Sequence, residues 1–260
     1  MNRTICFFKR NLKEVLRDSV IYIFCLLFPI AMLLLFNLIN SFSGGHTPTF
    51  EVKSIVPGII TFSYTFITLT LSLLISKDRQ TSFLKRLYSS PMKSSDFIFG
   101  YAIVGVIIGL LQTIVCVITG GIITLFRGGE FISLGGILLL IVSQLPILIF
   151  CVFLGVVMGT LFSDKSAPGI TSVLISASGI LGGSWMPIET MGGFETFARF
   201  LPFYPSVYLG RVTTGAYNAF GVVYTFNSFA VISLLTVLIY SVLSVILSII
   251  IFKNSMVSDN

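Results

Sequence analysis

The chain has 260 residues, of which 55% are hydrophobic and only 10% are charged. Because soluble domains carry about 25% charged residues, this composition excludes an ordinary soluble domain and predicts an integral membrane protein. The four cysteines are scattered and show no spacing typical of a disulfide framework or a zinc site. The net charge of +6 could suit a nucleic-acid partner. However, the basic residues lie between apolar runs, so we expect them to set the orientation of the protein and contact anionic lipid, and we expect no nucleic-acid partner.

Residues 4–18 have the pattern of an amphipathic helix. Its apolar face consists of Ile5, Phe8, Leu12, Val15 and Leu16. Basic residues flank this face, which is typical of a helix lying in a membrane interface. A helix packed on other protein is the alternative. The apolar run that follows is too long for the h-region of a signal peptide, so we expect it to be retained as the first span.

Six apolar runs are long enough to cross a hydrocarbon core, which takes about 20 helical residues. They cover approximately residues 20–40, 55–76, 97–126, 134–162, 168–184 and 228–252. The runs are continuous rather than alternating, which favours helices over a β-barrel. The predicted fold class is therefore an all-α polytopic membrane protein with six transmembrane helices in one domain, residues 1–260.

The distribution of Lys and Arg predicts the orientation of the spans. Of the 16 basic residues, only Lys53, Arg127, Arg199 and Arg211 fall in segments opposite the N-terminus, and the other 12 lie on the N-terminal side. Basic residues accumulate on the cytoplasmic side of membrane proteins. We therefore expect both ends of the chain in the cytoplasm and a location in the cell membrane.

The second span carries a stripe of hydroxyl side chains. Thr61, Thr65, Thr68 and Ser72 follow at spacings of four, three and four, which puts them on one helical face. Such a stripe can line a substrate path, with Phe62 and Phe66 beside it for an apolar ligand. It can equally bond to backbone carbonyls or join two helices, and this structural alternative is favoured.

A polar island at residues 77–93 separates the second and third spans. The stretch predicts a short helix with Phe83, Leu84, Leu87 and Tyr88 on one face, and Pro91 ends it. A solvated loop that only fixes topology is the alternative. A helix of about ten residues is marginal in water, so its apolar face requires lipid or another protein.

Small residues recur on faces of the later spans. In the fifth span they are Ser172, Ser176, Gly179 and Gly183. Similar pairs occur in the third span (Gly105 and Gly109) and the fourth (Gly155 and Gly159). Small residues let membrane helices approach closely, so we expect a compact bundle and a fifth-span face that meets another helix or a second subunit.

Residues 185–227 form a long segment between the fifth and sixth spans. It is rich in aromatic residues and is interrupted by Pro187, Pro202 and Pro205. Aromatic residues favour the membrane–water boundary, so we expect outer re-entrant or interfacial helices. A fully solvated loop is the alternative.

Recognisable catalytic and cofactor motifs are absent from the sequence. The single histidine, His46, cannot build a multi-histidine metal site, and no phosphate-binding loop or G-x-S-x-G motif occurs. We therefore assign no catalytic, metal or cofactor-binding residue. An intramembrane enzyme remains a weak alternative, because polar groups from distant spans would have to converge.

The order of these features resembles the permease subunits of ABC-2 type transporters. The island is similar to the family's cytosolic stretch in Leu84-Lys85-Arg86-Leu87 and Pro91, although Ser82 and Phe83 replace the usual glycine and threonine. Val56-Pro57-Gly58 resembles the family's entry to the second span. The run 182–187, followed by Leu201-Pro202 and Pro205, is similar to its outer re-entrant region.

The resemblance implies a transport subunit that is not itself an enzyme. A separate nucleotide-binding ATPase subunit would hold ATP and Mg and dock on the coupling helix at 77–93. The residues implied in coupling are Asp78, Arg79, Phe83, Leu84, Lys85, Arg86, Leu87 and Pro91. A second permease copy or paralogue would complete a dimer. The implied activity is export of an amphiphilic drug, peptide or lipid-like substrate, as in the multidrug efflux branch; an ATPase-independent channel or scaffold is the alternative.

Overall fold

The protein is a helical bundle in the computed structural model, which describes residues 3–44, 47–81, 94–127 and 131–258. This described part contains no β-strand, only one isolated bridge between Tyr217 and Val223. The predicted class, an all-α polytopic membrane protein, is thereby confirmed.

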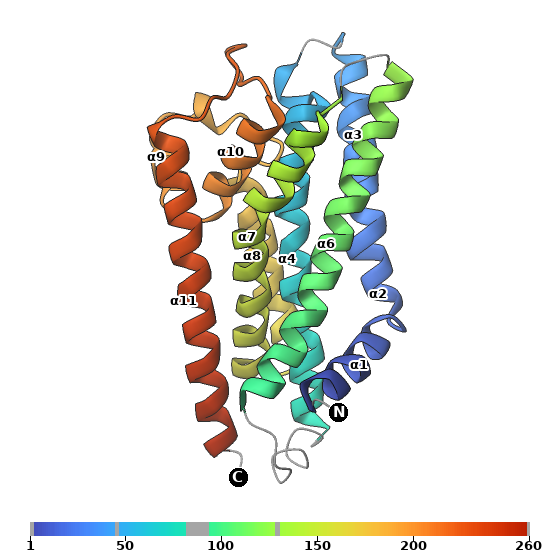
Figure 1. Cartoon of the computed structure of the whole chain (residues 1–260), viewed down its shortest axis with the longest axis vertical. Helices are drawn as coiled ribbons and strands as arrows, with labels where there is room; N and C mark the ends of the chain where they lie inside the picture. Colours follow the sequence, from blue (N-terminus) through green and yellow to red (C-terminus); the bar gives the residue numbers. More distant parts are fainter. Residues whose placement is uncertain (1–2, 45–46, 82–93, 128–130, 259–260) are drawn as a thin grey trace.

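The N-terminal region is a helix that leads into the first candidate span through an irregular turn. Helix α1 (Arg3–Val15) is followed by α2 (Ser19–Ile21), a π-helical segment η1 (Tyr22–Leu27) and α3 (Phe28–Phe42). In Figure 1, α1 lies at the lower end of the bundle, tilted away from α3. Single π-helical turns often mark functional sites, because they insert an extra residue into the helix.

Five helices of the described chain are long and apolar enough to cross a membrane. They are Tyr22–Phe42, α4 (Val52–Gln80), α6 (Ser94–Arg127), α7 (Leu134–Leu161) and Ser228–Ser255 within α11 (Ser228–Ser258). A sixth apolar helix, α8 (Ala167–Leu181), has 15 residues. At about 1.5 Å per residue, it is about 22 Å long, which is less than the ~30 Å thickness of a hydrocarbon core.

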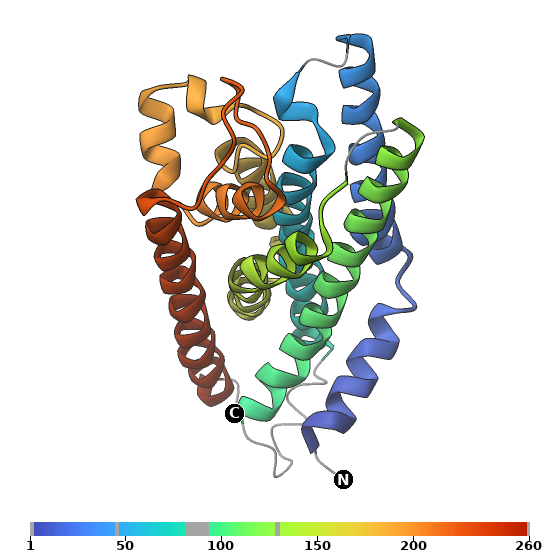
Figure 2. The same cartoon turned by 45° about the horizontal axis from the view of Figure 1, so that its top comes forward.

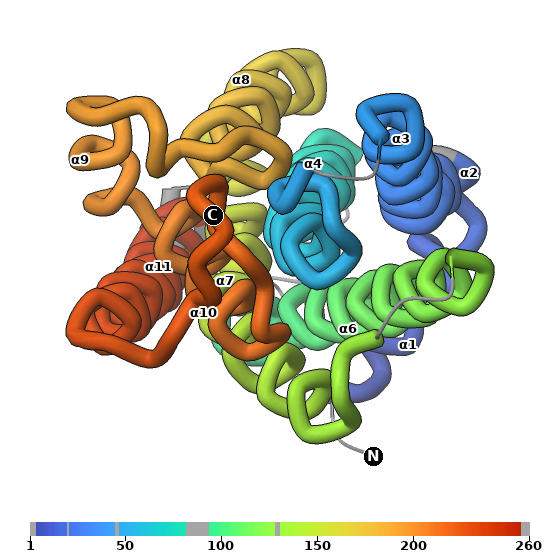
Figure 3. The backbone as a smooth tube through the Cα atoms, turned by 90° about the horizontal axis from the view of Figure 1, so that it is seen from above, coloured from blue at the N-terminus to red at the C-terminus, as the bar shows by residue number. Residues whose placement is uncertain are grey.

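Helix α4 is the centre of the bundle. It is surrounded by α3, α6, α7 and α8 when seen from above (Figure 3). In its most apolar 18-residue window, 83% of the residues are buried, compared with 22% in the first span and in α11. A side chain on α4 therefore contacts protein, whereas most of α3 and α11 faces the surroundings.

Short helices gather at the end of the bundle opposite α1. They are η2 (Pro48–Phe50), η3 (Ile188–Thr190), α9 (Gly193–Arg199) and α10 (Phe203–Thr214). Figure 2 shows α9 and α10 on the α8 and α11 side of this end. The close approach of this region to α4 requires glycine, because a Cβ at Gly58 would lie 2.2 Å from the carbonyl oxygen of Ser184.

Candidate functional site

Helix α1 packs on the beginning of α6 through an aromatic contact. The ring of Phe7 lies 5.3 Å from that of Phe97 and 4.9 Å from that of Tyr101, both edge-to-face. Gly100 makes room for it, because a Cβ there would be 2.4 Å from Phe7 Cδ1. Edge-to-face pairs add about 0.5–1.5 kcal/mol to the burial of their area.

The buried face of α1 differs from the apolar face predicted from the sequence. It is formed by Phe7, Asn11 and Val15, which are four residues apart. Of the predicted face, Val15 is buried, whereas Ile5 and Leu16 are 44% and 52% exposed. The physical reason is that α6 meets one edge of the apolar arc and leaves the other edge uncovered.

A buried carboxylate joins α1, α4 and α6. Asp78, in the last turn of α4, is only 2% exposed. It accepts two hydrogen bonds from the Arg10 guanidinium, Nη1 to Oδ2 at 2.5 Å and Nη2 to Oδ1 at 2.7 Å, and a third from the Tyr101 hydroxyl at 2.6 Å. We call these three residues the Arg10 clasp. A buried charge costs several kcal/mol unless it is paired and hydrogen-bonded, and the clasp meets both conditions.

Further charges extend the clasp along the surface. Arg10 Nη2 lies 2.7 Å from Glu14 Oε2, and Lys77 Nζ lies 3.4 Å from Glu14 Oε1. Burial acts to lower the pKa of Arg10, but the hydrogen bond and charge of Asp78 outweigh it and raise that pKa above its ordinary value. The guanidinium therefore stays charged, as the paired carboxylates require.

The residues predicted for ATPase coupling divide into two groups. Asp78 is held in the clasp, and Arg79 donates a hydrogen bond to the Thr160 carbonyl at the end of α7. Both therefore have contacts within the chain. The other six lie outside the described residues: Phe83, Leu84, Lys85, Arg86, Leu87 and Pro91.

The hydroxyl stripe of α4 is buried against helices of the same chain. Thr68 donates to the Cys151 carbonyl of α7 at 2.8 Å, and Ser72 donates to Leu69 in its own helix. Gly155 and Gly159 of α7 lie over this part of the stripe. A Cβ on Gly155 would be 3.1 Å from the Thr68 carbonyl oxygen, and one on Gly159 would be 2.9 Å from that of Ser72. This part of the stripe therefore packs α4 on α7 in the way that the structural alternative describes.

At its upper part the stripe joins a polar cluster that the sequence did not reveal. Thr61 donates to Gln144 Oε1 of α7 at 2.9 Å, and Gln144 Nε2 donates to the Ser206 carbonyl of α10 at 2.9 Å. Thr65 donates to the Phe62 carbonyl and accepts from Ser178 of α8 at 3.4 Å. The stripe thus contacts three other helices, and its role as a substrate path stays a prediction.

Phe62 and Phe66 belong to an aromatic cluster on another side of α4. Phe62 lies 4.8 Å from the Trp185 ring, and Phe66 lies 5.0 Å from Phe28 and 5.5 Å from Phe24. The cluster joins the first span and α4, and Trp185 extends it to the segment after α8. The sequence placed Trp185 in the outer segment but gave no sign that it reaches α4.

The predicted small-residue face of the fifth span has two parts. Ser172 and Ser176 are exposed on α8, whereas Gly179 and Gly183 are buried. A Cβ on Gly179 would be 2.5 Å from Trp185, and Gly183 has a φ of +60°, which favours glycine. The glycines therefore serve packing within the chain, and the serines remain accessible.

A second buried charge lies at the end of the bundle opposite α1. Arg211 of α10 is 1% exposed and donates to the carbonyl oxygens of Gly183 at 2.8 Å and Ser54 at 3.3 Å. Its Nη1 lies 3.6 Å from Glu189 Oε1, and Tyr224 donates a hydrogen bond to the same carboxylate. Burial raises the pKa of Tyr224, although Arg211 opposes this, so the phenol stays protonated as a donor.

The apolar helices define a multi-pass membrane protein. The two buried charge networks bind its central helix α4 at both ends, through Asp78 and through the Ser54 carbonyl. Residues 3–214 match the sequence model of the ABC-2 type transporter family. The chain therefore belongs to the ABC-2 type transporter family and is the membrane-spanning permease component of an ABC transporter, a component that pairs with an ATPase subunit. No curated protein matches the chain significantly.

Proposed function

We propose that this chain is the permease subunit of an ATP-driven exporter that moves an amphiphilic substrate outward across the cell membrane. The observation that carries the proposal is the Arg10 clasp, in which Asp78, at the start of the predicted coupling segment 77–93 and in the last turn of α4, binds Arg10 of α1 and Tyr101 of α6. ATP and Mg belong to the partner ATPase in this proposal, and this chain supplies the membrane path.

The clasp provides a physical route from the coupling segment into the membrane. A force on the chain after Gln80 acts on the end of α4, and the clasp transfers it to α1 and α6 at Asp78. Because α4 is the central helix and packs on α7 through glycines, its displacement would disturb the whole bundle. A ligand can shift such an arrangement only if it binds one of two states better, so ATP binding by the partner has to favour one position of α4.

Other features support the proposed orientation, assembly and substrate class. The excess of basic residues at the α1 end favours a cytoplasmic location for that end and for both chain ends. The exposed Ser172 and Ser176 on α8 suit a contact with a second permease copy or paralogue. The aromatic cluster around Phe62 suits an amphiphilic drug, peptide or lipid-like compound as substrate.

Co-purification with the ATPase tests the proposal. Tagged chain should bring down a nucleotide-binding subunit, and Leu84→Asp or Arg86→Glu should abolish this capture while leaving membrane insertion intact. Lys253→Glu, on the exposed surface near the end of α11, is the matched control and should leave the capture unchanged. Transport that continues without any ATPase would instead indicate a channel or scaffold, and lipid or peptide hydrolysis by the isolated chain would indicate an enzyme.

A further inference from the structure

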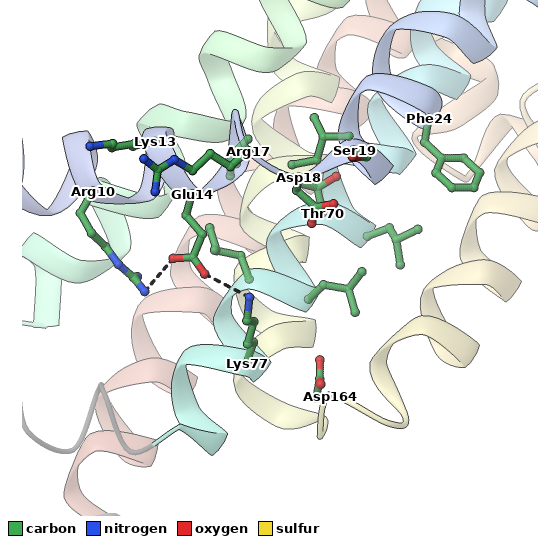
Figure 4. A pocket seen from close by; sticks show the side chains of 15 residues that line it. Arg10, Lys13, Glu14, Arg17, Asp18, Ser19, Phe24, Thr70, Lys77 and Asp164 are labelled. Atoms are coloured by element: carbon green, nitrogen blue, oxygen red, sulfur yellow. Dashed lines mark ion pairs between the residues drawn. The ribbon is translucent and has the colours of Figure 1, made fainter.

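A cavity of about 920 Å³ lies beside the Arg10 clasp, between α1, the π-helical start of the first span and α4. Figure 4 shows the ion-paired Arg10, Glu14 and Lys77 on one side of it and Phe24 on the other. A volume of ~300–1,000 Å³ is typical of small-molecule sites. None of the functions proposed above uses this cavity.

The cavity has a charged end and an apolar end. The basic groups come from Arg10 and Lys13 of α1, Arg17 in the turn after α1, and Lys77 of α4. From Lys77 the wall continues along one face of α4 through Leu73 to Leu69, two steps of four residues each. At 1.5 Å per residue, this wall is about 12 Å long. A polar head group at its charged end and the first part of an acyl chain at its apolar end therefore fit along it.

Four basic and three acidic side chains line the cavity, so its lining carries a net charge of +1. Glu14 is already paired with Arg10 and Lys77, and Asp164 accepts a hydrogen bond from Ser76 at 3.4 Å. Asp18 also lines the cavity. In contrast, Lys13 and Arg17 form no ion pair within the described chain. They are four residues apart in sequence, Lys13 in the last turn of α1 and Arg17 in the turn that follows, and an anion between them would offset the repulsion of their like charges.

We propose that this cavity binds one anionic phospholipid from the leaflet at the α1 end. The phosphate lies beside Lys13 and Arg17, and the upper part of a chain lies against Leu69, Leu73 and Phe24. The lipid is favoured as the source because Ile5 of α1 and Leu16, directly after α1, are exposed, as expected of a segment in the interface. The site depends only on membrane insertion and not on ATPase coupling.

Native mass spectrometry of the purified full chain tests this site. The chain should retain or take up one phosphatidylglycerol, in preference to phosphatidylcholine with the same acyl chains. Each basic residue near an anionic lipid contributes about 1 kcal/mol, so Lys13→Ala/Arg17→Ala should weaken this binding about 30-fold. Leu73→Trp fills the apolar end without changing the charge and should weaken it as well.

Matched controls separate a defined site from general attraction. Lys9→Ala/Lys253→Ala removes two exposed charges that do not line the cavity, and its affinity should equal that of the parent. Equal losses in both double variants, equal binding of phosphatidylcholine, or unchanged binding by Leu73→Trp would each overturn the proposal. Binding of inorganic phosphate as tight as that of the lipid would overturn the lipid as the ligand. Far-UV circular dichroism of each variant confirms that it is folded.

Discussion

The Arg10 clasp predicts a measurable coupling energy between two residues that are 68 positions apart in the chain. Arg10→Met leaves the Asp78 carboxylate buried with Tyr101 as its remaining clasp partner, and removal of one member of a buried pair costs about 3–5 kcal/mol. Asp78→Asn keeps the shape but removes the charge. In this variant Arg10 is 34% exposed and keeps its ion pair with Glu14. The free energy of unfolding should therefore fall by less than in Arg10→Met, by about 1.5–3 kcal/mol, as is typical of hydrogen bonds to charged groups.

The double variant isolates the interaction itself. Arg10→Met/Asp78→Asn should be less destabilised than the sum of the single variants, with a coupling energy of about 1–3 kcal/mol. The free energy of unfolding can be measured by titration with dodecyl sulfate in mixed micelles, followed by circular dichroism. Arg10→Lys should be intermediate, because an ammonium cannot reproduce the two-pronged hydrogen bonds of the guanidinium.

Function gives a second readout of the clasp. ATP hydrolysis by the partner subunit should proceed in the Asp78→Asn complex, but transport per ATP should fall, because α1 and α6 no longer follow α4. Lys9→Met removes an exposed charge one position away and should change neither stability nor transport. A coupling energy of zero, together with unchanged transport in Asp78→Asn, would refute the assignment of the clasp as a mechanical joint.

Three further substitutions follow from the packing of the central helix. Gly159→Val places a Cβ 2.9 Å from the Ser72 carbonyl oxygen and should lower the free energy of unfolding by about 1–3 kcal/mol in the same dodecyl sulfate titration. Gly169→Ala is the control, because no atom lies within 4 Å of the added Cβ, and it should leave the free energy of unfolding unchanged or raise it. Arg211→Met leaves Glu189 without its cation and should cost about 3–5 kcal/mol, and limited proteolysis should then cut residues 185–227 more readily than in the parent. Phe62→Leu should change stability by less than about 1.5 kcal/mol but lower substrate transport in vesicles, and unchanged transport would exclude the aromatic cluster from the substrate path.

The helices were predictable because membrane spans are a local property of the sequence. Apolar runs of membrane length, interrupted by charges, identify helices without knowledge of their partners. The stripe at Thr61, Thr65, Thr68 and Ser72 was also predicted to share one face, because helical periodicity determines it. Periodicity does not identify the facing helix, and the contact with Gly155 and Gly159 appears only once α4 and α7 are placed together.

The clasp and the Arg211 network could not be predicted, because their partners are distant in sequence. The sequence places Arg10 among the basic residues on the N-terminal side and Asp78 among the predicted coupling residues, and nothing local indicates that one neutralises the other. The sequence places Arg211 among the charges of the outer segments. A lone arginine among apolar residues could nevertheless have indicated a buried charge with partners, because arginine is almost never fully buried without them. The buried edge of α1 could not be predicted for the same reason, since its contact with α6 selects that edge.

The short length of α8 has a consequence for the surrounding lipid. A helix of about 22 Å in a hydrocarbon layer of about 30 Å creates a hydrophobic mismatch of about 8 Å. A helix shorter than the hydrocarbon layer is accommodated by thinning of the bilayer, by its flanking residues or by neighbouring helices. The fit of α8 to the membrane therefore depends on the thickness of the bilayer, and so on its lipid composition as well as on the protein.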